Sequence, residues 1–79
     1  MKVKMYYFAQ VAEIFGCTNQ ELSLKDGACL NDLIDQLNHE QPSLAKQPYQ
    51  VAVNQSLVKS NPQLNEGDEI ALLPPFAGG

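Results

Sequence analysis

A single long amphipathic helix is the strongest structural signal in this sequence of 79 residues. Within residues 29–40, four aliphatic side chains recur at the i, i+3, i+4 and i+7 spacing that gives a helix one apolar face. They are Leu30, Leu33, Ile34 and Leu37. Pro42 should end the helix, because the residue before a proline avoids helical backbone angles, and Asp26 is the expected N-cap. One helix cannot enclose a core alone, so it must cover one face of a sheet.

Alternating apolar and polar residues predict strands on both sides of this helix. The predicted strands are residues 2–8, 20–24, 49–53, 57–59 and 69–73. A short helix over residues 10–15, ended by Gly16, follows the first strand. The second strand is polar, which suits the edge of a sheet. Asn54-Gln55 is the expected tight turn, because asparagine tolerates a positive φ, and the segment around residues 43–50 is expected to be an irregular connector.

This order of elements predicts an α+β fold of the ubiquitin-like β-grasp type. Its mixed sheet has four to five strands, one main helix across one face, and a short helix after the first strand. The last strand returns beside the first. A ferredoxin-like fold would need a second long helix, and no other segment is long enough. Residues 1–73 are the expected domain, and residues 74–79 are the expected extended tail.

The charge balance excludes several classes of partner. Five lysines, no arginine and nine acidic residues give a net charge of −4. An acidic chain without arginine is unsuited to nucleic acid, which needs cations for its phosphates and bases, and to the surface of a membrane. No apolar run resembles a membrane span or signal peptide. We therefore expect a cytoplasmic protein without nucleic-acid or membrane partners.

The familiar catalytic and metal-binding sets are missing from the sequence. His39 is the only histidine and should face solvent, opposite the apolar stripe of the helix. Cys29 is expected to be a buried thiol. Cys17 follows a glycine in a loop, without a nearby cation to activate it. The two cysteines lack the spacing of a zinc site, so no metal is expected to bind.

Two groups of residues are candidates for a protein interface. Phe8 and Leu73 should lie on the sheet face opposite the helix, with Leu57 joining them, and exposed apolar patches often mark partner surfaces. The alternative is that loops cover them or that they are scattered surface side chains. Glu66, Asp68 and Glu69 form a small acidic cluster. Paired carboxylates can do acid–base work, but such a run is more often a solvated turn, and its other functional interpretation is a contact of Glu66 and Asp68 with a basic partner.

The end of the sequence differs from the rest. Residues 74–79 read Pro74-Pro75-Phe76-Ala77-Gly78-Gly79. The prolines end the sheet ladder and stiffen the exit, so the tail can project by up to roughly 20 Å at about 3.3 Å per residue. Gly78 and Gly79 have no Cβ, which lets a narrow channel close around them.

A terminal carboxylate is a poor electrophile at pH 7 and must be activated. The sequence contains no phosphate-binding loop. The ATP and metal needed to activate the carboxylate must therefore come from a separate activating enzyme.

These residues resemble the small subunit of molybdopterin synthase, the MoaD-type sulfur carriers. The matching segments are Tyr7-Phe8-Ala9-Gln10-Val11 with Glu13, Val51-Ala52-Val53-Asn54-Gln55, Leu64 to Ile70, and Leu73 to Gly79. The connector from Gln41 to Pro48 matches nothing distinctive, and Phe76 is bulkier than the expected aliphatic residue. Pro-Pro shortly before the diglycine is the most specific feature, because thiamine-type carriers usually lack it.

The resemblance implies a β-grasp carrier that is not catalytic on its own. A ubiquitin-activating-type adenylyltransferase would adenylate Gly79, and a sulfur donor protein would supply the sulfur of the resulting thiocarboxylate. The large synthase subunit would then take in the tail, with Gly78 threading its channel, and sulfur would pass to cyclic pyranopterin monophosphate. The alternatives are a carrier for thiamine or another thio-product, a ubiquitin-like modifier or interaction module, or a chain with no carrier role.

Overall fold

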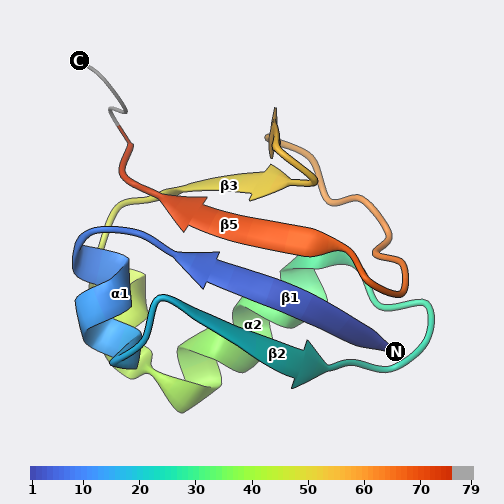
Figure 1. The fold of residues 1–79 in the computed structure, drawn as a ribbon, viewed down its shortest axis with the longest axis horizontal. Coiled ribbons are helices and arrows are strands. Elements are labelled where there is room, and N and C mark those ends of the chain that lie inside the picture. Colours follow the sequence, from blue (N-terminus) through green and yellow to red (C-terminus); the bar gives the residue numbers. More distant parts are fainter. Residues whose placement is uncertain (76–79) are drawn as a thin grey trace.

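The computed structural model describes residues 1–75 of the chain as one sheet with helices packed on it. The strands are β1 (Lys2–Tyr7), β2 (Asn19–Ser23), β3 (Gln50–Val53), β4 (Ser56–Val58) and β5 (Glu69–Leu73). The helices are α1 (Gln10–Phe15), α2 (Leu30–Glu40) and the 3₁₀ helix η1 (Pro42–Lys46). The strand order is β2-β1-β5-β3-β4, with the helices on one side of the sheet (Figure 1).

The last strand lies in the middle of this sheet. β5 pairs in parallel with β1, where Met5 is opposite Ile70, and antiparallel with β3, where Val53 is opposite Ile70. The β1–β2 and β3–β4 pairs are antiparallel. The mixed sheet confirms the predicted α+β fold of the β-grasp type, and β2 lies at an edge as predicted.

Alternation along the strands separates the core from the opposite face. Val3, Met5 and Tyr7 of β1 are buried, whereas Lys2 and Lys4 are exposed. The buried side chains pack with those of the helix and of β5 into one apolar cluster. From the helix and β5 it includes Leu30, Leu33, Leu37, Ile70 and Leu72. Burial of aliphatic side chains is the main stabilising term for a domain of this size.

The start of α2 differs from the prediction. Cys29, not Asp26, is the N-cap, and its backbone N–H donates to the Asp32 carboxylate at 2.8 Å in a capping box. The prediction of Asp26 was wrong because the residues between it and Leu30 do not continue the helix; Cys29 is still extended. Asp26 instead lies 3.2 Å from the Met1 ammonium group.

The connector after α2 contains more structure than expected. Pro42 begins η1, a position where its missing N–H costs nothing. Leu44 from this turn is buried in the core. The β3–β4 turn is confirmed, with φ of 50° at Asn54 and 72° at Gln55, the positive values that a tight hairpin turn requires.

Candidate functional site

The sheet face opposite the helices carries the exposed apolar side chains. Phe8 is 46% exposed and Leu57 is 60% exposed. Leu57 is opposite Ala52, which is opposite Ala71, so all three lie on the same face. The partly buried Leu73 is two residues from Ala71 along β5 and therefore shares this face. We call Phe8, Leu57 and Leu73 the apolar patch; their predicted placement on this face is confirmed.

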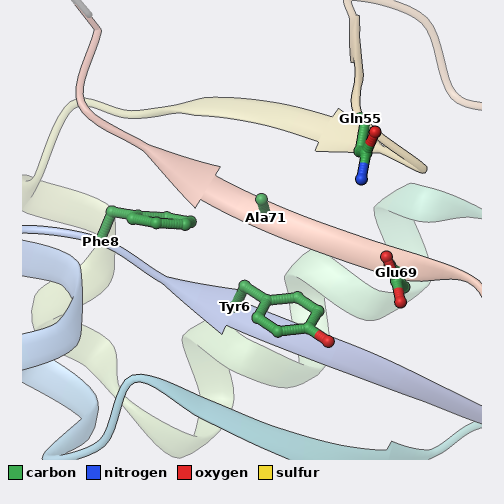
Figure 2. A pocket seen from close by; sticks show the side chains of 5 residues that line it. All are labelled: Tyr6, Phe8, Gln55, Glu69 and Ala71. Carbon is green, nitrogen blue, oxygen red and sulfur yellow. The ribbon is translucent and has the colours of Figure 1, made fainter.

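A hollow lies beside the apolar patch. Its volume is about 320 Å³, and its lining residues are Tyr6, Phe8, Gln55, Glu69 and Ala71. Figure 2 shows the ring of Phe8 at one end, Ala71 in the middle, and the Tyr6 hydroxyl and Glu69 carboxylate towards the other end. Gln55 reaches the hollow from the β3–β4 turn. The hollow thus changes from apolar to polar along its length.

The exit of the tail is held by contacts to neighbouring segments. The Phe8 N–H donates to the Leu72 carbonyl at 3.2 Å, which extends the β1–β5 pairing to the end of β5. The side-chain amide of Gln50 donates to the carbonyl of Pro75. Gln50 is opposite Leu73, so its side chain lies on the same face as the apolar patch. Pro75 is therefore tied to this face of the sheet.

Sequence reasoning missed Gln50. A polar residue at the start of a strand carries no distinctive pattern, and its contact with the tail becomes visible only through the β3–β5 register. Pro74 and Pro75 follow β5 directly, as predicted. The predicted tail residues Phe76, Ala77, Gly78 and Gly79 lie outside the described residues.

The acidic turn has a structural role in the domain. Glu66 accepts a hydrogen bond from the Lys2 N–H at 2.9 Å. Asp68 accepts from the Asn65 N–H at 2.8 Å and from the Asn54 side-chain amide at 3.0 Å. These bonds tie the turn before β5 to β1 and to the β3–β4 turn. A partner contact by Glu66 and Asp68 stays a prediction.

The titratable residues do not gather into a catalytic group. Burial raises the pKa of Tyr7 to about 12, partly offset by a hydrogen bond from Gln20. Burial also raises the pKa of Tyr49. His39 is exposed, as predicted. Cys29 is only partly buried, because it caps α2 at the surface, so the expectation of a fully buried thiol was wrong.

Cys17 is also partly buried and packs against the core. Within residues 1–75, no three His, Cys, Asp or Glu side chains are grouped so that they could hold a metal ion. In the same part of the chain, no helix has the length and apolarity needed to cross a membrane. The described residues present an exposed apolar patch and an exit for the tail that is held by hydrogen bonds.

The fold and this face define a ubiquitin-like β-grasp protein. The ThiS family profile matches residues 5–79, and the chain belongs to the ThiS family. The molybdopterin synthase sulfur carrier subunit of Chlamydomonas reinhardtii is 36% identical over the full length of both chains. The protein of the same name from Mycobacterium tuberculosis is 37% identical over 100% of this chain and 99% of its own. The MoaD-type resemblance is thus confirmed.

Solved structures agree with this assignment. A Pyrococcus furiosus structure assigned to molybdopterin converting factor subunit 1 has a TM-score of 0.89 and 27% identity over 96% of this chain and 99% of its own. A Helicobacter pylori complex of subunits 1 and 2 of molybdopterin-converting factor contains a chain with a TM-score of 0.73 and 29% identity over both full chains. SAMP1 from Haloferax volcanii has a TM-score of 0.82 and 25% identity over both full chains.

Proposed function

We propose that this chain is the sulfur-carrier subunit of a molybdopterin synthase and that the carboxyl group of Gly79 is its reactive group. The observation that carries the proposal is the match over the full chain, at 36–37% identity, to proteins named as that subunit. The matched region includes the diglycine. The Helicobacter pylori relative forms a complex with the second subunit of its converting factor, which supports a large subunit as the partner of this chain.

The cycle begins by activating a group that is unreactive as a carboxylate. An oxygen of the Gly79 carboxylate attacks the α-phosphorus of ATP on the adenylyltransferase, and pyrophosphate leaves. A sulfur donor protein then supplies the sulfur that displaces AMP, which leaves a thiocarboxylate at Gly79. The adenylyltransferase provides ATP and metal. In the large subunit, the thiocarboxylate sulfur forms a bond to a carbon of cyclic pyranopterin monophosphate. Water then cleaves the acyl C–S bond of the resulting thioester, which leaves the sulfur on the substrate and returns Gly79 to a carboxylate.

The geometry of the domain suits this use of the tail. β5 lies between β1 and β3, so hydrogen bonds on both sides hold the strand from which the tail leaves. Pro74 and Pro75 provide no N–H for further pairing, and Gln50 holds the Pro75 carbonyl. A partner that binds the domain therefore meets the tail at a defined starting point, which reduces the entropy lost when the tail enters a channel.

The apolar patch is the proposed docking surface for both partners, which bind one at a time. Phe8 and Leu57 are large exposed apolar side chains, and desolvating such residues is a main source of binding energy at protein interfaces. Glu66 and Asp68 would add contacts with a basic partner at the far end of β5. Such charges mainly affect the rate and specificity of association.

A second function is favoured by one comparison. SAMP1 from Haloferax volcanii shares the fold at a TM-score of 0.82, and a second Haloferax volcanii structure carries the name small archaeal modifier protein 1. In a modifier, the activated Gly79 would form an amide bond with a lysine of another protein. A carrier for thiamine or another thio-product would instead form the same thiocarboxylate but deliver sulfur elsewhere.

Deletion of Gly79 tests the proposed function. Sulfur transfer to cyclic pyranopterin monophosphate, assayed with the large subunit and the activating system, should be abolished. The thermal midpoint of the domain should be unchanged, because the deletion leaves residues 1–75 intact. Sulfur transfer by the shortened chain would refute the assignment of Gly79.

A further inference from the structure

We propose that the hollow on the uncovered sheet face binds an arginine side chain of the large synthase subunit. The inference rests on the proposed function and names a specific contact within it. The hollow has a volume of about 320 Å³, at the lower limit for pockets that bind small molecules. It lies on an open sheet face, so a side chain from a docked protein can enter it directly (Figure 2).

The order of groups along the hollow matches a long side chain with a polar end. Ala71 provides a small side chain in the middle, between larger residues. An aliphatic stem would lie over Ala71 and beside the ring of Phe8. The polar end would then reach the Tyr6 hydroxyl and the Glu69 carboxylate. Long cationic residues bury their stems in this way while their charged ends find polar partners.

The charge of Glu69 selects a cation. Within residues 1–75, no lysine nitrogen lies within 4.0 Å of its carboxylate, whereas Glu21 on the same face is 3.7 Å from the Lys2 ammonium. Lys4 is opposite Glu69 in the β1–β5 register, but its side chain is exposed and does not form an ion pair with the Glu69 carboxylate in residues 1–75. An apolar side chain would leave Glu69 desolvated and unpaired in the complex, which is unfavourable.

Arginine suits the hollow better than lysine. Its planar guanidinium carries five N–H donors and can bond a carboxylate with two of them. The Tyr6 hydroxyl offers a further acceptor in the hollow. The same planar group can stack on an aromatic ring, and Tyr6 and Phe8 both provide one. The chain itself has no arginine, so the guanidinium must come from another protein.

The large subunit is the committed source of this arginine. The Helicobacter pylori chain that is similar to this one is in a complex with subunit 2 of its molybdopterin-converting factor, so a comparison supports the large subunit as a partner that binds this domain. A side chain inserted in a hollow is an anchor that lowers the dissociation rate. Such an anchor therefore fits the synthase better than a transient encounter.

The first test compares two carboxylates on the same sheet face. Glu69→Gln and Glu21→Gln make the same isosteric change and the same change in net charge, but only Glu69 lines the hollow. Isothermal titration against the large subunit should give a Kd about tenfold higher for Glu69→Gln and a nearly native Kd for Glu21→Gln. Equal weakening by both, or no weakening by Glu69→Gln, would overturn the proposal.

The second test exchanges the charges. Glu69→Arg should bind the large subunit poorly because two cations would then meet in the hollow. Each arginine of the large subunit is then changed to glutamate, and one of these variants should restore binding to Glu69→Arg without restoring binding to a Leu73→Arg carrier, whose substitution lies outside the hollow. If no arginine-to-glutamate variant restores binding to Glu69→Arg, the proposal is wrong.

Thiocarboxylate formation separates this inference from the proposed function. Glu69→Gln should lose much less in its rate of conversion by the activating enzyme than in its binding to the large subunit, because the arginine is assigned to the large subunit. A rate that falls as far as binding to the large subunit would contradict that assignment. If native protein never forms a thiocarboxylate, the proposed function itself fails. If native protein does form a thiocarboxylate and Glu69→Gln binds the large subunit with native affinity, the proposed function stands and only the role of the hollow has been misassigned.

Discussion

The side-chain amide of Gln50 donates a hydrogen bond to the Pro75 carbonyl, linking the first residue of β3 to the start of the tail. Gln50 is also opposite Leu73 in the β3–β5 register. One residue therefore contacts the final strand through its backbone and the tail exit through its side chain. This arrangement fixes the direction in which the chain leaves β5 as far as Pro75.

Removing this hydrogen bond should affect activation more than folding. For Gln50→Ala, we expect the free energy of unfolding to fall by no more than about 1 kcal/mol, because a single hydrogen bond contributes about that much. The KM of the activating enzyme for the carrier should rise about threefold to tenfold, because the tail must be ordered on binding.

Two further variants refine the Gln50 prediction. Gln50→Glu keeps the size of the side chain but loses the amide donor, so its KM should resemble that of Gln50→Ala. Gln63→Ala, at an exposed position away from the tail, should leave KM unchanged. Native kinetics for both Gln50 variants would show that the contact does not position the tail.

Charge placed in the apolar patch should prevent docking. Phe8→Arg and Leu73→Arg each put a cation where an apolar contact is proposed, and burial of an unpaired charge is costly. We expect each to raise the Kd for both the large subunit and the activating enzyme at least about tenfold. Ala45→Arg in η1 is the control, with the same change in charge at an exposed position. If both associations survived the patch substitutions unchanged, the docking surface would lie elsewhere.

The core prediction concerns Leu33, whose side chain is fully buried under the sheet. Leu33→Ala should reduce the free energy of unfolding by about 2–5 kcal/mol, because it removes buried methyl groups and leaves a cavity. Asp35→Ala on the exposed side of α2 should change it by no more than about 0.5 kcal/mol. Urea denaturation measures both values. Similar small effects would contradict the assignment of Leu33 to the core.

The pKa of Tyr7 predicts a loss of stability in alkali. Burial raises this pKa from 10.0 to about 12 in the folded state. The stabilisation is fully present below pH 10 and is lost as pH rises towards 12, because the unfolded chain releases its proton first. By pH 11.5 the loss should be about 1–2 kcal/mol, less than two full pKa units imply, because this pH is still below the folded-state pKa of Tyr7.

Urea unfolding between pH 9 and pH 11.5 checks the alkaline loss. Tyr7→Phe keeps the ring stacked on Phe15, where the centroids are 4.1 Å apart, but has no phenolic proton to release. Its stability should decline less steeply above pH 10 than that of the native protein. Identical slopes for the two proteins would mean that Tyr7 does not titrate as proposed.

Local patterns in the sequence predicted most of the elements, because alternation and helical spacing determine which side chains can be buried together. The predicted helix at residues 29–40 is observed as Leu30–Glu40. Two features of the chain escaped this reasoning. Asp26 has good capping chemistry but lies too far from the helix. Pro42 correctly marked the end of α2, which stops at Glu40, but the local pattern did not show that Pro42 also begins η1, where Leu44 completes the core.

The candidate site was only partly predictable for a different reason. Strand alternation was enough to place Phe8 and Leu73 on one face. The hollow and the Gln50 contact depend on the register between strands that are far apart in the sequence, such as Gln50 and Leu73. That register is set by the packing of the whole sheet, so local patterns do not reveal it.

The mass of the intact chain after incubation with ATP, the activating enzyme and the sulfur donor protein tests the central claim most directly. We predict an increase equal to the replacement of one oxygen by sulfur, located in the terminal peptide that contains Gly79 and absent from the Gly79 deletion. A chain of unchanged mass, or one joined through Gly79 to a lysine of another protein, would contradict the assignment as a sulfur carrier.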